Sequence, residues 1–396
     1  MRRVVILSEA KNPLHSALRV NSGRHPLVIS QPPGGILPPI HCIGVRMTSE
    51  EPALSRAKGL SMTNGGFQSG DQSATLLAAG VSVLISLASL FAGPGRTGSK
   101  PAAAARRPES LPAFNGGRAF EDLKRLVAFG PRPPGSKALG ESRAWIQSQL
   151  KAAGCSVEED SFTASTPVGE VPMTNIIAKA AGAKPGIIML AGHYDTLRRA
   201  DIRFVGANDG GSSAAMLLEF ARLYCLRKNP LNIWLVFFDG EEALVNWTAT
   251  DSLYGSRHLA AKLASDGEIA RIQGMILLDM VADKHLNIYK DTNSTTWLTD
   301  LIFKTAAKVG YGKEFLDEKS AYGDDHQPFV DDGVAAVDLL GNVGPPTASS
   351  SFGAYWHTAE DTVDKCSASS LTVVGRVVVA TVAELELASA GRPRPH

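Results

Sequence analysis

A short apolar run that ends in a pair of glutamates constrains the fold of this chain more than any other feature. Residues 233–238 are all apolar and mostly β-branched or aromatic, which predicts a buried strand because the run is too short for a helix. Asp239 and Gly240 break the strand, and Glu241 and Glu242 follow at once. Ligands of open α/β sheets bind at the carboxyl ends of strands. One carboxylate there can hold a metal while the other moves protons, although a solvated acidic turn is the alternative.

Short apolar runs alternate with segments of helical spacing from residue 114 onward. We expect an α/β fold, with a mostly parallel central sheet flanked by helices on both faces, over one domain of residues 113–392. The expected strands are 187–191, 233–238, 275–278 and 334–340, and the expected helices are 119–129, 142–153, 212–226, 256–263, 296–309 and 369–386.

The first part of the chain has a different character. Residues 1–73 are low in complexity and show no sustained period, so we expect a disordered N-terminal region. Residues 74–92 carry no charge and have a length between a signal-peptide core and a minimal membrane helix. Residues 93–112 are rich in Ala, Pro and Arg and read as a linker. The basic residues after the apolar segment oppose export by the positive-inside rule, but the segment itself favours an extracytoplasmic protein that is secreted, periplasmic or membrane-anchored.

Composition limits the classes of partner. The 396 residues include 44% hydrophobic residues and carry a formal net charge of +1, so nothing indicates nucleic-acid binding. We expect a monomer.

The cysteines are Cys42, Cys155, Cys225 and Cys366, with no C-x-x-C pair, which gives neither a zinc ribbon nor a disulfide framework. The spacing allows one disulfide without indicating its pairing.

Polar residues recur where an expected strand ends or a loop begins. Taken singly, Asp209 could cap a helix, and a histidine beside a tryptophan is more often a packing residue. Their joint occurrence at strand ends favours a metal site instead. Imidazole and carboxylate groups form a set that suits Zn²⁺. These residues are His193, Asp195, Asp209, Glu241, Glu242, Asp279, Asp324, Asp325, His326 and His357.

The motifs that contain these residues resemble a known enzyme clan. The pattern is similar to the zinc aminopeptidases with the phosphorylase/hydrolase-like fold, and within them to animal-type glutaminyl-peptide cyclotransferases (glutaminyl cyclases). The resemblance extends from about residue 114 to the C-terminal helix. Its motifs are His193-Tyr-Asp195, Asn208-Asp-Gly210, Phe238-Asp-Gly-Glu-Glu-Ala243, Trp247 with residues 251–260, Leu277-Leu-Asp279, Asp324-Asp-His326 and Tyr355-Trp-His357.

This resemblance implies a reaction and a set of roles. The reaction converts the N-terminal glutamine of a peptide to pyroglutamate with release of ammonia, using one zinc per chain. Asp209, Glu242 and His357 would be the zinc ligands. The remaining roles are Glu241 as general acid/base, Asp279 hydrogen-bonded to Glu241, Asp324 in the same acidic network, and Trp247 and Trp356 lining the substrate pocket.

Two departures from the animal pattern stand out. Asp338 occupies a position where the animal cyclases carry a histidine, so the network beyond Asp324 is expected to differ. Gly192 and Ala214 occupy positions where the animal secreted forms carry a disulfide pair. Neither departure involves an expected metal ligand.

Two rival interpretations remain. A two-zinc aminopeptidase would use His193 and Asp279 for a second metal, with Asp209 bridging both ions, and all these residues are present. Trp247 and residues 251–260 favour the cyclase. A catalytically inactive, membrane-tethered interaction domain would be expected to have lost a ligand or the base, and none is lost.

Overall fold

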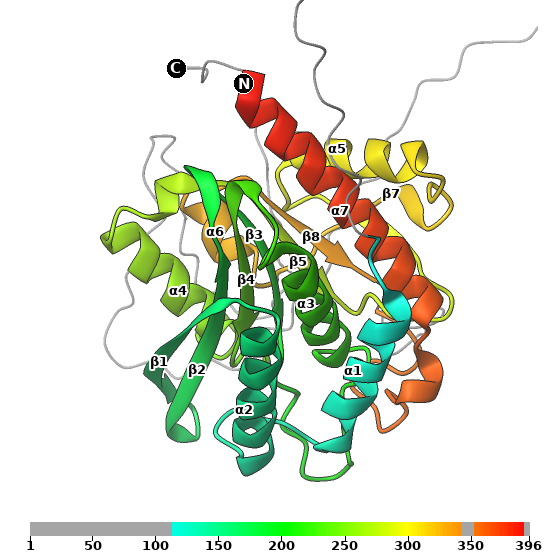
Figure 1. Ribbon diagram of the computed structural model, residues 1–396. Coiled ribbons are helices and arrows are strands. Elements are labelled where there is room, and N and C mark those ends of the chain that lie inside the picture. Colours follow the sequence, from blue (N-terminus) through cyan, green and yellow to red (C-terminus); the bar gives the residue numbers. More distant parts are fainter. Residues whose placement is uncertain (1–112, 342–351, 392–396) are drawn as a thin grey trace, which may run out of the picture. The chain divides into compact units, whose positions relative to one another are not determined.

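A six-stranded sheet organises the described part of the chain, which is residues 113–341 and 352–391 of the computed structural model. Neighbours β4, β3, β5 and β8 are parallel, whereas β2 runs antiparallel to both β1 and β4. The expected α/β fold with a mostly parallel sheet is confirmed (Figure 1). In spatial order the strands are β1 (Ser156–Thr166), β2 (Gly169–Ala180), β4 (Asn229–Phe238), β3 (Gly182–His193), β5 (Ile272–Asp279) and β8 (Ala336–Leu340).

Helices cover both faces of this sheet. Successive residues of β3 point to opposite faces, so that Ile188 and Leu190 belong to one core while Met189 and Ala191 belong to the other. The first core is covered by α1 (Gly116–Ala128), α2 (Lys137–Ala152), α3 (Gly211–Tyr224), α5 (Thr296–Lys308) and α7 (Ala368–Gly391). The second is covered by α4 (Tyr254–Ser265) and α6 (Gln327–Asp331), which lie on the other side of the sheet (Figure 1).

Every strand and helix expected from the spacing has a counterpart, but some elements were missed. The β1–β2 hairpin is the largest of these. β1 is mainly exposed and polar, and the apolar pattern of β2 is interrupted by Pro172, Thr174 and Asn175. The other missed elements are α6 and a separate two-stranded sheet of β6 (Ile288–Asp291) and β7 (Phe315–Ser320). Short 3₁₀ helices occur at Ile269–Arg271 and Val363–Lys365.

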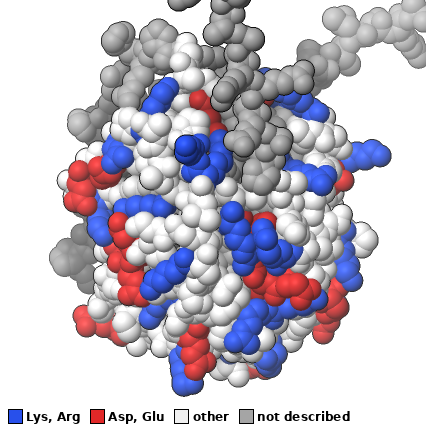
Figure 2. All heavy atoms as spheres, in the orientation of Figure 1, with Lys and Arg blue, Asp and Glu red and all other residues white. Residues whose placement is uncertain are grey.

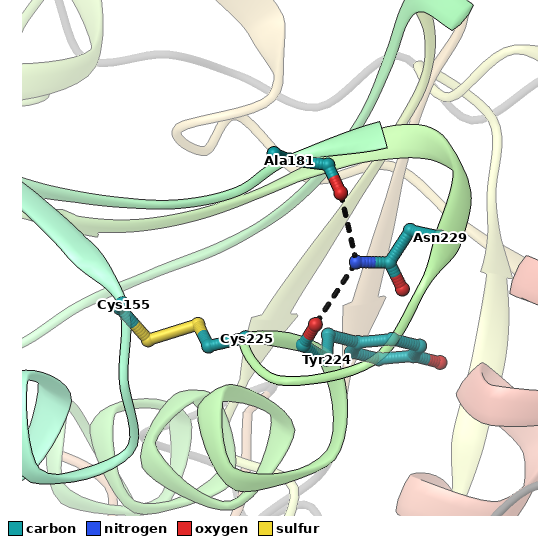
Figure 3. The surroundings of a disulfide bond; sticks show 5 residues. All are labelled: Cys155, Ala181, Tyr224, Cys225 and Asn229. Atoms are coloured by element: carbon teal, nitrogen blue, oxygen red, sulfur yellow. Dashed lines mark hydrogen bonds between the residues drawn. A yellow bond between two sulfur atoms is a disulfide. The ribbon is translucent and has the colours of Figure 1, made fainter. Parts of the chain in front are cut away.

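A disulfide joins Cys155, just before β1, to Cys225 at the end of α3 (Figure 3). The side chain of Asn229 fixes the same corner, since its Nδ2 donates to the carbonyl oxygens of Tyr224 at 2.9 Å and Ala181 at 3.3 Å. The structure thereby supplies the pairing that the spacing left open, and Cys366 is buried and free. A disulfide favours an oxidising, extracytoplasmic environment.

Charged side chains of both signs are mixed on the face of the molecule that Figure 2 shows. Figure 2 shows Lys and Arg interspersed with Asp and Glu on the face that carries α1, α3 and α7. Within residues 113–341 and 352–391, no helix is long and apolar enough to cross a membrane. The expected apolar segment 74–92 lies outside the described residues, as do segment 1–73 and the expected linker 93–112.

Candidate active site

The carboxyl ends of three parallel strands bring polar residues to one edge of the sheet. β3 ends at His193, which pairs in register with Phe238 at the end of β4. β5 ends at Asp279. Because β4 leads directly into Glu241 and Glu242, these side chains meet at the edge where ligands of α/β sheets bind.

Asp209, Glu242 and His357 form a first group of metal-ligating side chains. The Nε2 atom of His357 lies 3.3 Å from Oδ2 of Asp209 and 3.2 Å from Oε1 of Glu242. Both carboxylate oxygens of Glu242 are buried, and neither has a hydrogen-bond partner within the part of the chain that the structure describes. A half-buried imidazole with two buried carboxylates, one of them without a hydrogen-bond partner among the described residues, is a set that fits a divalent metal ion.

A second group contains His193, Asp209 and Asp279. Nε2 of His193 lies 3.1 Å from Oδ1 of Asp279 and 3.2 Å from Oδ1 of Asp209. Asp209 therefore belongs to both groups. The structure brings together the ligands of both the one-metal and the two-metal interpretations.

The local backbone explains why Asp209 faces this site. Asp209 lies in a turn before α3, where Gly210 has a φ of 78°. A β-carbon at Gly210 would lie 2.3 Å from the carbonyl oxygen of Asp195, so only glycine fits. Oδ1 of Asn208 accepts a hydrogen bond of 2.7 Å from the backbone N–H of Ala282, which ties the turn to the segment after β5.

Asp195 and Arg132 fix the backbone of the segments that carry the site residues. The carboxylate of Asp195 accepts the backbone N–H groups of Glu241 at 3.3 Å and Glu242 at 3.4 Å, which fixes the turn that follows β4. The fully buried guanidinium of Arg132 donates to the carbonyl oxygens of Tyr194, Val205 and Gly206. Sequence reasoning missed Arg132, because a single arginine in a Pro-rich loop carries no signal.

Glu241 is buried beside the metal-ligating residues but belongs to neither group. Burial raises the pKa of Glu241 well above its ordinary value, the nearby carboxylates of Glu242 and Asp324 raise it further, and His193 opposes them. The expected hydrogen bond between Asp279 and Glu241 is not formed among the described residues. Asp279 bonds to His193 instead, and burial raises its pKa to about 7.

Asp324, Asp325 and Asp338 extend the acidic network away from the sheet edge. All three are buried, and burial raises the pKa of each carboxyl group. Asp338 lies on β8 opposite Leu277, and neither of its carboxylate oxygens has a hydrogen-bond partner among the described residues. Burial therefore raises the pKa of Asp338 well above its ordinary value and favours its protonated form. Asp338 is the residue that departs from the pattern of the animal cyclases. The charge of Asp324 contributes to its raised pKa, so the departure affects the network beyond Asp324.

A cavity of about 710 Å³ opens onto Glu241, Glu242 and His357. Trp247 and Trp356 both line it, as the sequence pattern implied. Trp247 lies at the rim with 49% of its surface exposed, and the Trp356 ring stacks on the His357 ring with centroids 3.8 Å apart. Sequence reasoning missed two further aromatic walls, Tyr322 and Phe352, because their rings meet only in the folded chain.

Comparison with known proteins assigns the family. The model of peptidase family M28 matches residues 175–382, which is more than half of the chain. The chain belongs to peptidase family M28.

The relatives of this M28 protein include many cyclases. A glutaminyl-peptide cyclotransferase of Boiga irregularis is 32% identical over 298 residues, covering 65% of this chain and 78% of that protein. The crystal structure of an Acidobacteriales bacterium glutaminyl cyclase is 42% identical with a TM-score of 0.69, covering 72% of this chain and 100% of that chain. A leucine aminopeptidase precursor from Bacteroides thetaiotaomicron is 27% identical with a TM-score of 0.62, covering 69% of this chain and 98% of that chain. The chain is a glutaminyl cyclase-like M28 protein with a buried His/Asp/Glu metal-binding group.

The disulfide of this M28 protein differs in place from the one expected in the animal secreted enzymes. A β-carbon at Gly192 would lie 2.5 Å from Cβ of Ser213, the neighbour of Ala214, so this position is closely packed without a disulfide. The bond between Cys155 and Cys225 instead joins the β1 and α3 ends.

Proposed function

We propose that this chain is a zinc-dependent glutaminyl-peptide cyclotransferase, which converts the N-terminal glutamine of peptides to pyroglutamate and ammonia. The observation that carries the proposal is the position of Glu241, a buried carboxyl group that faces an aromatic-walled cavity beside three metal-ligating side chains. The similarity to glutaminyl cyclases over most of the chain supports it.

Asp209, Glu242 and His357 would hold one zinc ion. Bound there, zinc supplies a Lewis acid for the side-chain amide of the substrate. The α-amine forms a new bond to the side-chain amide carbon, and the bond from that carbon to the amide nitrogen breaks. Glu241 accepts a proton from the attacking amine and delivers one to the nitrogen that leaves as ammonia. Burial raises the pKa of Glu241 above its ordinary value, which makes it a better proton acceptor than an exposed carboxylate.

The remaining predicted site residues would support this chemistry. Asp279 and Asp324 would maintain the acidic surroundings of Glu241, since neighbouring carboxylates favour its protonated form. The indole rings of Trp247 and Trp356 would exclude water, which matters because hydrolysis competes with cyclisation. The attack is intramolecular, so the pocket has mainly to fold the glutamine side chain back towards the amine.

A two-metal aminopeptidase is the second candidate, favoured by the His193–Asp209–Asp279 group and by the similarity to a leucine aminopeptidase precursor. Metal stoichiometry and ammonia release from a Gln-Ala dipeptide separate the two functions. A cyclase should contain one zinc per chain and release ammonia. Its ammonia release should stop after chelation and recover on addition of Zn²⁺. Ammonia release by protein shown to be metal-free would refute the zinc mechanism.

The expected setting of the protein completes the proposal. Its partners would be peptides with an N-terminal glutamine, with no nucleic acid, and we expect it to act as a monomer. The Cys155–Cys225 bond supports an extracytoplasmic enzyme that is secreted, periplasmic or tethered through residues 74–92.

A further inference from the structure

The segment from Tyr355 to Asp361 carries one ligand of the proposed zinc and contacts the backbone that carries another. His357 has a φ of 55°, in the left-handed region that residues other than glycine rarely adopt. Such a backbone conformation persists only where the surrounding structure fixes it. The contacts on both sides of His357 therefore identify what holds this ligand in place.

Tyr355 anchors the segment upstream of His357. Its buried hydroxyl donates to Oδ2 of Asp283, which lies beyond the end of β5. The carbonyl oxygen of Asp283 accepts a 2.6 Å hydrogen bond from Ser370 at the start of α7, so the anchor is itself fixed. Thr358 closes the turn around His357 by donating from Oγ1 to the carbonyl oxygen of Tyr355 at 2.8 Å.

Asp361 anchors the segment downstream and contacts the turn that contains Asp209. Its two carboxylate oxygens accept separate backbone N–H groups, from Asn208 at 2.8 Å and from Asp209 at 3.1 Å. Its carbonyl oxygen accepts the N–H of Ala207 at 3.3 Å. Asp361 is 1% exposed, and the buried Arg132 guanidinium offers it a compensating charge. Three consecutive N–H groups before α3 are thus held by one residue.

We propose that Asp361 is a positioning residue, which sets the spacing between the ligands Asp209 and His357, and that Tyr355 positions the other side of His357. This inference rests on the proposed zinc site. Partners that orient a ligand commonly change metal affinity when they are lost. The sequence signal is the distance of four residues from His357 to Asp361, which lets one short segment supply both a ligand and a support for a second ligand.

Isosteric variants test the proposal in the full-length protein. Asp361→Asn leaves only one acceptor oxygen for the two N–H groups, and Tyr355→Phe removes only the hydroxyl donor to Asp283. Glu360→Gln is the matched control, because Glu360 is an exposed neighbour on the same segment. The measurements are the zinc dissociation constant, by competition with a chelator of known affinity, and the melting temperature of the metal-stripped protein.

We expect the zinc dissociation constant to rise about tenfold or more for Asp361→Asn. For Tyr355→Phe it should rise roughly threefold, as for one lost hydrogen bond. The Glu360→Gln protein should match the parent, and the metal-stripped Tyr355→Phe protein should melt close to the parent. If Asp361→Asn does not fold, Tyr355→Phe still tests whether the contacts that hold this segment set the zinc affinity.

Unchanged zinc affinity in the variants would overturn the positioning role while leaving the zinc site intact. The role would also fail if the metal-stripped variants lost stability to the same extent as they lost zinc affinity. A parent protein that binds no zinc would instead refute the metal site, and this inference with it.

Discussion

At the scale of single residues, two adjacent glutamates occupy different chemical positions. Glu242 faces His357 and Asp209 as a metal-ligating group, whereas Glu241 stands outside both groups. Burial and neighbouring carboxylates raise the proton affinity of Glu241. The division follows from the turn after β4, where the carboxylate of Asp195 holds both backbone N–H groups.

Glu241→Gln should keep the metal and lose turnover. The amide cannot accept the proton of the attacking amine, so we expect a decrease in kcat of about a thousandfold or more. Zinc content and kcat on a Gln-Ala dipeptide are the measurements. Ordinary turnover in this variant would show that Glu241 is not the acid/base group.

Glu242→Gln and His357→Ala should lose zinc and activity together, because each removes one of three protein ligands. Asp209→Asn should behave in the same way. His193→Ala is the informative comparison, since a one-zinc enzyme should retain its metal in that variant. Metal analysis of the purified variants checks these outcomes, and loss of zinc from His193→Ala alone would favour a centre that includes His193.

The sequence indicates the metal-ligating residues better than it indicates their contacts. Asp209, Glu242 and His357 stand in motifs beside expected strands and helices, and the structure brings them together. The partner of Asp279 depends on side-chain conformations, and it is His193 rather than Glu241. Asp361 was not singled out from the sequence, because its backbone partners Asn208 and Asp209 lie 153 and 152 residues away and meet it only in the folded chain.

At the scale of elements, the pattern of apolar residues in the sequence indicated strands only where their side chains are buried. The strands β3, β4 and β5 are covered on both faces and give continuous apolar runs. The outer strand β1 is mainly exposed, so its polar sequence does not distinguish a strand from a loop. The short strands β6 and β7 contain too few residues to establish a period.

At this scale, we expect the disulfide to stabilise the fold. Cys155 and Cys225 are 70 residues apart, and a cross-link closing a loop of that length stabilises the fold by about 4 kcal/mol through the entropy of the unfolded chain. Cys155→Ala with Cys225→Ala should lower the free energy of unfolding by a similar amount. Guanidinium unfolding with and without reductant measures it, and the double variant should not respond to reductant. An unchanged unfolding midpoint in the double variant would contradict the estimate.

At the scale of the whole molecule, we expect the candidate site to need only the part of the chain that begins near residue 113. Every described helix and strand, and every residue of the two metal-ligating groups, lies between residues 113 and 391. Removing residues 1–110 should therefore leave a folded protein that binds zinc and is active. Melting temperature, zinc content and turnover check this outcome. Insolubility or lost zinc would show that the removed region contributes to the fold.

The reaction product tests the proposed function most directly. Purified protein is incubated with Gln-Xaa and Leu-Xaa dipeptides, with the Glu241→Gln variant as control, and the products are identified by mass spectrometry. We expect Gln-Xaa to lose about 17 mass units as ammonia with its peptide bond intact, because the amine attacks within the same molecule. Leu-Xaa should remain unchanged. Free leucine from Leu-Xaa, with no pyroglutamyl product from Gln-Xaa, would contradict the cyclase and indicate a two-metal aminopeptidase.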